Sequence, residues 1–313
     1  MISLGVKGVL EDCHPDSYPS QSLCAREAVS EKRMLSTRLW IGTLLVLLTL
    51  GVVVADNWLS RWQPFLFVLV LGLALVSVQE LLALFGDERP PPWLCFAAVT
   101  SLIVTNWLAR WLATLNVWQC LSAVFAAIVV AAFLVEMARF VEPGASVNRI
   151  ARTVWLASYV GLLPCFLIQT RWLQGDSPYF GTWALTLAVF VPKGCDIGAY
   201  FTGRLIGRHL MAPVLSPKKT WEGAAGGIIA AIALTWAIDF FAGIFPNPLA
   251  RMAFGMSVGL AGMLGDLAES LIKRDCRSKD ASHVVPGFGG VLDVVDAILF
   301  ASPVAYIWFS CLT

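Results

Sequence analysis

PFLFVLVLGLALVSVQELLALF, residues 64–85, is the stretch that decides the fold class, and Glu80 near its end is its one charged residue. An α-helix rises about 1.5 Å per residue, so roughly 20 apolar residues cross the hydrocarbon core of a bilayer. A membrane β-strand would alternate apolar and polar residues over about 10 positions. Because this run is continuous, it predicts a transmembrane helix.

Similar apolar windows recur along the whole chain. They are 39–55, 92–114, 117–138, 152–170, 180–200, 224–246, 251–271 and 294–312. The chain is 58% hydrophobic and 14% charged, whereas soluble domains have about 45–50% apolar and about 25% charged residues. We therefore predict an all-α, polytopic transmembrane protein with about nine membrane-spanning helices.

Lysine and arginine predict the orientation, because cytoplasmic loops carry an excess of both. A cytosolic N-terminus places most of the 22 lysines and arginines in cytosolic segments and leaves four outside. Those four are Arg61, Arg110, Arg171 and Arg251. We expect a multi-pass protein of the plasma (inner) membrane with its C-terminus outside. The net charge of +1 gives no sign of a nucleic-acid partner.

We expect three parts in the chain. Residues 1–38 are polar and lack the apolar core of a signal peptide, so they predict a weakly ordered cytosolic tail. Residues 39–175 would form N-terminal transmembrane helices that serve as scaffold and lipid cavity. Residues 176–313 would form a C-terminal transmembrane catalytic domain, because the two most highly charged loops lie there and both are predicted to be cytosolic.

A polar stripe follows the window 251–271. Its members recur at steps of three and four residues and share one helical face: Gly255, Gly259, Gly262, Asp266, Glu269, Ser270 and Lys273. The glycines permit close helix contact. A lysine at a helix end can extend to the interface, which explains Lys273. Asp266 lies inside the apolar run, and intramembrane acids usually face a cavity, so it is predicted to be functional.

Two further acids, Asp293 and Asp296, open the last predicted helix. The helix dipole favours an acid at that position and could account for one of them. Together with Asp266 they would make a cluster of three carboxylates, whose mutual repulsion calls for a cation. Carboxylates without histidine or cysteine suit Mg²⁺, which completes its shell with water and phosphate. The sequence therefore predicts a metal–phosphate site.

Glycine and basic residues surround these acids. The turn PGFGG at 286–290 can bring the backbone N–H groups of Gly289 and Gly290 close to a phosphate. Lys273, Arg274 and Lys279 flank it, although the excess of cytosolic cations would explain them without a ligand.

A second basic segment lies upstream. Two lysines between two hydroxyl residues, just before a helix start, form a plausible anion clasp. The four are Ser216, Lys218, Lys219 and Thr220. Earlier in the chain, Lys193 and Asp196 could neutralise each other, but Asp196 is also placed to join the site.

These motifs resemble the phosphatidate cytidylyltransferase (CDP-diacylglycerol synthase) family. The family signature runs approximately S-x-x-K-R-x4-K-D, then P-G-H-G-G-x-x-D-R-x-D. Residues 270–296 are similar to it but have Phe288 where the family has histidine and Val294 where it has arginine. The segment DIGAYFTGRLIGRHLMAPVLSPKKTWEG at 196–223 also resembles the family's D-T-G-A-Y-F-x-G and S-P-K-K-T-W-E-G motifs.

The resemblance implies an enzyme that converts CTP and phosphatidate to CDP-diacylglycerol and pyrophosphate at the cytosolic membrane face. It also implies Mg²⁺, a second cation such as K⁺, and a homodimer. The residues assigned to catalysis are Asp266, Lys273, Asp293 and Asp296, of which the three aspartates would bind metal. Those assigned to substrate binding are Asp196, Ser216, Lys218, Lys219, Thr220, Ser270, Arg274, Lys279, Gly289 and Gly290.

Two alternatives remain open at this stage. A related CTP-dependent enzyme could act on an ether lipid or a polyprenol, because nothing in the sequence specifies the lipid tails. A cation- or proton-coupled transporter could use Asp196, Asp266 and Asp293 as a relay. The phosphate-suited loops argue against a transporter, since a relay would not need them.

Overall fold

The computed structural model describes most of the chain after residue 50. The described residues are 51–52, 54–57, 63–86, 89–111, 116–278 and 290–313. All of them belong to one unit, Thr49–Thr313. The predicted tail at 1–38 and most of the predicted window 39–55 lie outside the described residues.

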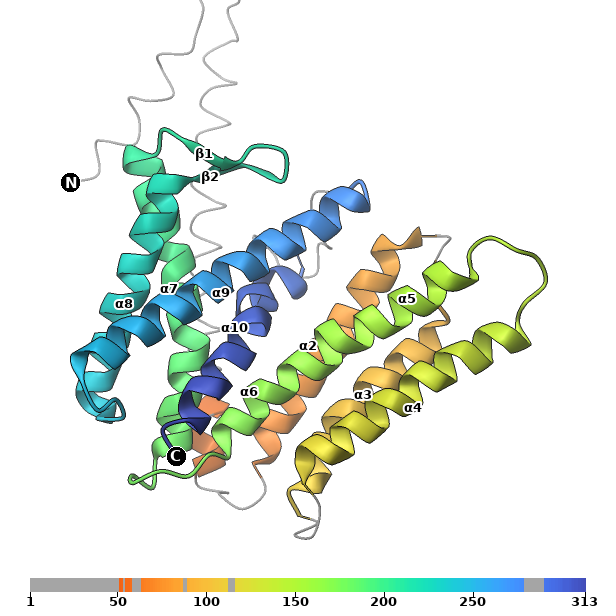
Figure 1. Cartoon of the computed structure of the whole chain (residues 1–313), viewed down its shortest axis with the longest axis horizontal. Helices are drawn as coiled ribbons and strands as arrows, with labels where there is room; N and C mark the ends of the chain where they lie inside the picture. Colours follow the sequence, from red (N-terminus) through yellow and green to blue (C-terminus); the bar gives the residue numbers. More distant parts are fainter. Residues whose placement is uncertain (1–50, 53, 58–62, 87–88, 112–115, 279–289) are drawn as a thin grey trace, which may run out of the picture. The chain divides into compact units, whose positions relative to one another are not determined.

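The described chain is mostly helical (Figure 1). Its helices are α2 (Pro64–Leu84), α3 (Pro92–Ala109), α4 (Val117–Ala138), α5 (Ser146–Leu156), η2 (Ala157–Leu162), α6 (Leu163–Arg171), α7 (Phe180–Ile206), α8 (Trp221–Ala242), α9 (Pro248–Asp275) and α10 (Leu292–Ser310). Within the described residues, seven helical stretches are long and apolar enough to cross a membrane. The class of polytopic helical membrane protein is confirmed, while the count of nine spans and the orientation stay predictions.

The stretch Ser146–Arg171 is one such span, although its winding changes in the middle. α5 passes into the π-helix η2, and η2 passes into α6. The Leu163 amide donates to the Ser158 carbonyl, five residues back. Pro164 follows directly and has no N–H to continue the α-helical pattern, so a wider turn just before it is physically reasonable.

α9 has 28 residues, which is long enough to span a membrane, but it is less apolar than the seven stretches and does not belong to them. It packs against α7, α8 and α10. A Cβ atom added to Gly262 would lie 2.7 Å from Cβ of Pro192 in α7. One added to Gly265 would lie 2.6 Å from the Asp296 carbonyl oxygen in α10. These two glycines therefore allow α9 to contact both neighbours closely, as predicted for Gly262; Gly265 lies outside the predicted stripe.

A short β-hairpin joins α7 to α8, which the all-α prediction missed (Figure 1). Strand β1 (Leu210–Ala212) pairs antiparallel with β2 (Ser216–Thr220). Strands this short show no clear apolar alternation, so the sequence pattern gave no signal for them. The hairpin ends where Thr220 Oγ1 accepts a hydrogen bond of 3.1 Å from the Gly223 amide, which caps the start of α8.

We predict that Gly265→Ala lowers the free energy of unfolding by about 1–3 kcal/mol, because the added methyl group must push α9 away from the α10 backbone. Gly72→Ala is the matched control: Gly72 lies in α2, and a Cβ there would have nothing within 4 Å. The control should unfold at or slightly above the wild-type temperature, since alanine favours helix over glycine. Thermal unfolding of the purified variants in detergent measures both, and equal midpoints for the two would contradict the close contact.

Candidate active site

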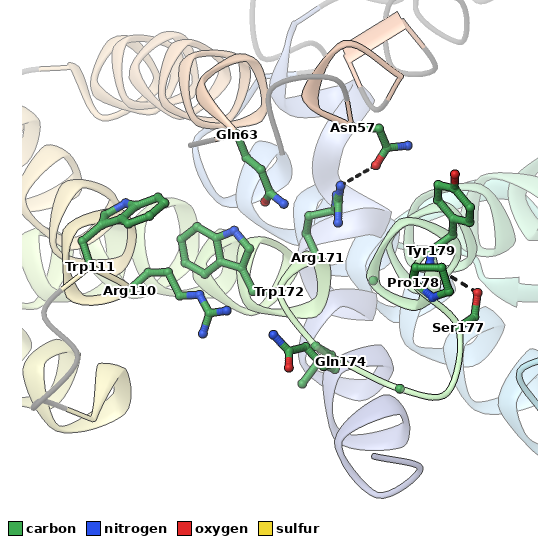
Figure 2. Close-up of a pocket in the computed structure, with 13 residues that line it drawn as sticks. Asn57, Gln63, Arg110, Trp111, Arg171, Trp172, Gln174, Ser177, Pro178 and Tyr179 are labelled. Atoms are coloured by element: carbon green, nitrogen blue, oxygen red, sulfur yellow. Dashed lines mark hydrogen bonds between the residues drawn. The ribbon is translucent and has the colours of Figure 1, made fainter. Parts of the chain in front are cut away.

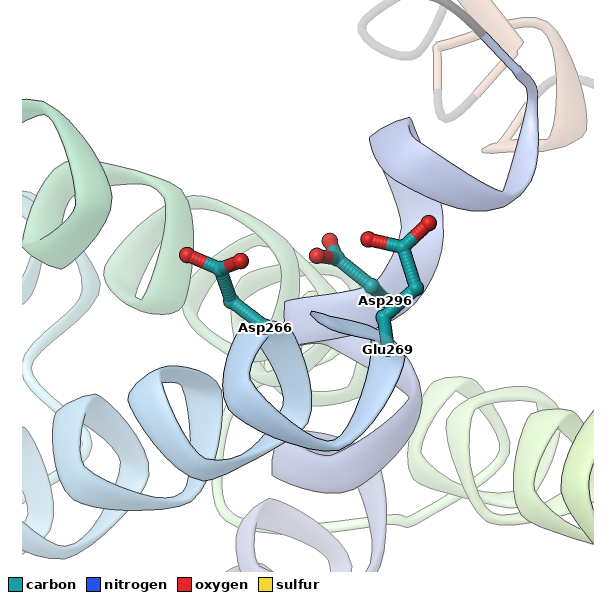
Figure 3. A group of neighbouring side chains, drawn as sticks. All are labelled: Asp266, Glu269 and Asp296. Atoms are coloured by element: carbon teal, nitrogen blue, oxygen red, sulfur yellow. The ribbon is translucent and has the colours of Figure 1, made fainter. Parts of the chain in front are cut away.

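Three carboxylates from two helices converge beside the close contact of α9 with α10. Asp266 and Glu269 lie one turn apart on α9, and Asp296 lies on α10 (Figure 3). Each offers one oxygen atom, and these atoms lie within 4.8 Å of one another. Among the described residues this is the group with the composition and spacing of a metal site. We call these three residues the acidic cluster.

Glu269 is the member that sequence reasoning did not assign to the metal. It is 1% exposed, and its Oε1 atom has no hydrogen-bond partner in the described part of the chain. A buried oxygen without a partner costs free energy, so this atom is suited to a ligand that the structure does not contain. Its place in the polar stripe, three residues after Asp266, was the signal that could have found it.

Asp293, assigned to the metal from the sequence, lies next to the acidic cluster and is engaged by other groups. Its carboxylate forms an ion pair with Lys273 and accepts a 2.6 Å hydrogen bond from the Gly290 amide. Lys273 also pairs with Glu269 at 3.2 Å between Nζ and Oε2. Lys273 therefore links Asp293 to the cluster.

Lys193 on α7 contributes a second cation. Its Nζ atom lies 3.1 Å from Oδ1 of Asp296 and 3.3 Å from Oδ2 of Asp196. The pairing of Lys193 with Asp196 that the sequence suggested is present, but the same lysine also reaches the acidic cluster. Asp196 is joined to the site through this shared ammonium group.

The hairpin brings a third cation to the cluster. Lys219 on β2 pairs with Asp266 at 2.7 Å between Nζ and Oδ2. Arg274, near the end of α9, donates to the carbonyl of Leu215 at 3.4 Å, so the hairpin is tied to α9 at two points. Of the clasp predicted from the sequence, Lys219 is the member that pairs with an acid of the cluster.

The other predicted substrate contacts lie in different settings. Thr220 is used as the cap of α8. Ser216, Lys218 and Ser270 make no side-chain hydrogen bond or ion pair within the described ranges, and Lys218 is exposed. Gly290 donates its amide to Asp293. Lys279 and Gly289 lie outside the described residues.

Glu80, at the far end of α2, positions the start of α10. Its two carboxylate oxygens accept hydrogen bonds from the amides of Val291 at 2.8 Å and Leu292 at 2.9 Å. An acid at a helix N-terminus satisfies free N–H groups and opposes the helix dipole. Because Asp293 and Asp296 follow directly, Glu80 helps to place both of them. Its position inside an apolar run was the only sequence signal for this role.

The site carries an excess of negative charge. Its acids outnumber its lysines among the described residues: Asp196, Asp266, Glu269, Asp293 and Asp296 face Lys193, Lys219 and Lys273. The donors of the acidic cluster are all carboxylate oxygens, which hard divalent cations such as Mg²⁺ prefer. The unpartnered Glu269 oxygen, the charge excess and the oxygen donors all fit such an ion.

The chain is similar to a known protein family and to several of its curated members. Residues 36–312 match the model of the cytidylyltransferase family. A phosphatidate cytidylyltransferase of Chlamydia pneumoniae is 32% identical over 163 residues, which cover 50% of this chain and 53% of that protein. One of Brucella suis is 38% identical over 136 residues, covering 44% and 50%. The Arabidopsis thaliana protein named phosphatidate cytidylyltransferase 5, chloroplastic, is 32% identical over 197 residues, covering 56% and 49%. The chain spans about half the length of these curated relatives.

We predict that Lys193→Met lowers the free energy of unfolding by about 1–3 kcal/mol, because the buried Asp296 carboxylate and Asp196 both lose their ammonium partner. Lys218→Met is the control, since that lysine is exposed and unpaired in the described structure. Thermal unfolding in detergent is the measurement. The double variant Lys193→Met/Asp296→Asn should recover part of the loss, and a single variant as stable as the control would show that Lys193 does not hold the site together.

Proposed function

Because the chain belongs to the cytidylyltransferase family, we propose that it transfers the cytidylyl group of CTP to phosphatidate. The products are CDP-diacylglycerol and pyrophosphate. The observation that carries the proposal is the acidic cluster, held by lysines from three different elements, at the close contact between α9 and α10.

The proposed reaction joins two anions. A phosphate oxygen of phosphatidate attacks the α-phosphorus of CTP, a new P–O bond forms, and the bond to the β-phosphate oxygen breaks as pyrophosphate leaves. A phosphate monoester is already ionised near neutral pH, so the attack needs no strong general base. The main barrier is electrostatic repulsion together with the demand for in-line alignment.

The acidic cluster is our proposed Mg²⁺ site. Asp266, Glu269 and Asp296 would hold the ion, and a bound divalent cation would neutralise phosphate charge and orient the phosphates. In this proposal Asp293 does not replace Glu269 as a ligand. It stays beside the site, where it holds Lys273 and the Gly290 amide in place. A second cation such as K⁺ remains part of the proposal without an assigned residue.

The lysines supply positive charge that can be shared with substrate. Lys273, Lys219 and Lys193 each bind a carboxylate of the site, and an ammonium group has three donors, so each can also bind a phosphate oxygen. Lys218 is exposed next to Lys219, and Arg274 lies on the neighbouring helix end. We assign these cations to the phosphates of CTP and phosphatidate, where they offset repulsion and stabilise departing pyrophosphate.

An apolar cavity offers a place for part of the lipid. It has a volume of about 100 Å³ and lies among α2, η2, α6, α7 and α10, with Val295, Ile298 and Leu299 on the same helix as Asp296. The volume is much smaller than a diacyl lipid, so the tails would continue along the outside of the helices. The cavity joins residues from both predicted transmembrane parts, 39–175 and 176–313, whose boundary remains a prediction.

The proposed membrane placement rests on the excess of lysine and arginine in the segments predicted to be cytosolic. We propose that the acidic cluster faces the cytoplasm, where CTP is found, in a multi-pass protein of the plasma (inner) membrane. A homodimer is part of the proposal through the family resemblance. The identity of the lipid tails is left to experiment, with ether lipid and polyprenol substrates as alternatives to phosphatidate.

The direct test incubates purified protein with labelled CTP, phosphatidate and Mg²⁺ and measures labelled lipid and pyrophosphate. We expect both products in equal amounts, and none when Mg²⁺ is removed by a chelator. A folded preparation that forms no CDP-lipid from phosphatidate, from an ether-linked analogue or from a polyprenyl phosphate would reject the proposed function.

We predict that Glu269→Gln lowers the rate of CDP-diacylglycerol formation by about 100-fold or more. The reason is that the proposed Mg²⁺ site would lose one of its three carboxylates. Glu142→Gln removes an exposed carboxylate elsewhere and should leave the rate unchanged. The assay is a Mg²⁺ titration of both variants with a parallel check of thermal unfolding. Wild-type activity in Glu269→Gln at low Mg²⁺ would remove Glu269 from the metal site.

Asp293→Asn tests the neighbouring position. We expect it to abolish product while the protein stays in the membrane, because Lys273 loses one of its two carboxylate partners and keeps only Glu269. A loss of rate that high Mg²⁺ does not restore would favour this positioning role, whereas restoration by Mg²⁺ would return Asp293 to the set of metal ligands. A fully active variant would exclude both roles.

A further inference from the structure

A pocket of about 750 Å³ lies among the ends of several helices (Figure 2). No residue of the acidic cluster lines it. It is lined by Gln63 just before α2, Arg110 just after α3, Arg171 at the end of α6, and the segment that leads from Trp172 to α7. None of these residues has a part in the proposed reaction. The volume is within the range of small-molecule binding pockets.

The pocket and the acidic cluster lie at opposite ends of the helices that connect them. Gln63 precedes α2, and Glu80, which holds the start of α10, lies 17 residues further along the same helix. At about 1.5 Å per residue these positions are about 25 Å apart along the axis. Gly181 and Asp196 are related in the same way along α7. The pocket is therefore a separate site, close to the opposite membrane interface.

Two buried polar side chains in the pocket each have one atom without a hydrogen-bond partner among the described residues. Gln63 is 7% exposed, and its Oε1 atom has no hydrogen bond within the described residues. Arg171 is 8% exposed, and its Nε atom also has no hydrogen bond within the described residues. Its Nη2 atom is engaged, because it donates to Asn57 Oδ1 at 2.7 Å. Buried polar atoms are nearly always satisfied, so these two indicate a polar ligand. The Nε–H of Arg171 is a donor and suits an anion, whereas Oε1 of Gln63 is an acceptor and suits a hydroxyl group of the ligand.

The described residues that line the pocket include two arginines and no acid. Arg110 is exposed, and no carboxylate within the described chain lies at ion-pair distance from it. Asp56 is the acid nearest in sequence to Gln63, but its oxygens accept hydrogen bonds from the amides of Phe65 at 3.1 Å and Leu66 at 2.8 Å. That carboxylate is committed to the start of α2. Asp56 also attracts the Arg171 guanidinium electrostatically, so the donors that remain for an anion are the Arg110 guanidinium and the Nε–H of Arg171.

The walls of the pocket are held in place by close backbone packing. A Cβ atom on Gly181 would lie 2.1 Å from the Arg171 carbonyl oxygen, and one on Gly175 would lie 2.4 Å from the Phe180 ring. The segment between α6 and α7 can therefore fold tightly against Arg171 only with glycine at these places. A pocket whose polar groups are positioned in advance loses less entropy when it binds a ligand.

The geometry points to a binding site for a phosphate group at this end of the molecule, and we propose that Arg110 and Arg171 hold it, with Gln63 as a further polar contact. Guanidinium groups match phosphate oxygens in charge and in planar, two-point geometry. Trp111, Trp172 and Tyr179 also line the pocket, and such aromatic residues typically lie at the level of lipid headgroups. The expected ligand is an anionic phosphate ester, of which a phospholipid headgroup is the source in a membrane and inorganic phosphate the source in solution.

The test uses the purified full chain in a neutral detergent. Wild type, Arg110→Gln and Arg139→Gln are each titrated with dihexanoyl phosphatidylglycerol, with dihexanoyl phosphatidylcholine and with sodium phosphate. Bound adducts are counted by native mass spectrometry, and thermal unfolding is followed in parallel. Arg139 is the matched control, because it is exposed at the end of α4 away from the pocket, so its variant loses the same charge elsewhere.

We expect Arg110→Gln to bind phosphatidylglycerol about tenfold more weakly than wild type, and Arg139→Gln to bind it equally well. Protection by sodium phosphate that disappears in Arg110→Gln would identify the phosphate group itself as the ligand. Protection by phosphatidylglycerol alone would identify the lipid headgroup. Equal binding by Arg110→Gln and wild type, or no preference of wild type for phosphatidylglycerol over phosphatidylcholine, would overturn the proposal. None of these outcomes depends on the proposed reaction.

Discussion

Carboxylates among membrane helices must be balanced by positive charge, and that constraint shapes the part of this protein around α9 and α10. Lys193 from α7, Lys219 from the hairpin and Lys273 from α9 each pair with an acid of the site. An unpaired charge in so apolar a setting would be costly, and intramembrane acids usually face partners or a cavity. The ion pairs therefore connect α7, the hairpin, α9 and α10. They also leave an excess of acids, which is the property that a divalent cation requires.

Small residues make this arrangement sterically possible. Without side chains at Gly262 and Gly265, the α9 backbone lies directly against α7 and α10. Gly265 packs against the carbonyl oxygen of Asp296, and Asp266 is the next residue after Gly265. The close helix contact therefore also brings the carboxylates of Asp266 and Asp296 together. Helix association in membranes depends on such contacts, because the surrounding lipid is as apolar as the side chains. Packing and chemistry are thus coupled at one point of the molecule.

α2 shows how a single helix can organise both polar ends of the molecule. Near its C-terminal end Glu80 binds the first amides of α10, and just before its N-terminus Gln63 faces a polar pocket. Neither residue belongs to a charged motif, and the helix between them is apolar. Its contribution to the acidic cluster is indirect, since it positions the turn from which Asp293 and Asp296 begin.

Composition and apolar periodicity alone determined the helical membrane class and nearly all the helix positions that lie in the described residues, because a bilayer demands long apolar runs with internally satisfied backbones. The polar stripe placed Asp266 and Glu269 on one face for the same reason of helical geometry. That Glu269 joins Asp266 and Asp296 in the acidic cluster, with Asp293 beside it, is known only from the tertiary structure. Asp293 is engaged by Lys273 and the Gly290 amide, whereas Oε1 of Glu269 has no partner among the described residues. The cap by Glu80 and the pocket lined by Arg110 and Arg171 likewise come from contacts between residues far apart in the chain. Periodicity reports which side of one element is apolar, whereas the distance between two side chains depends on how separate elements pack.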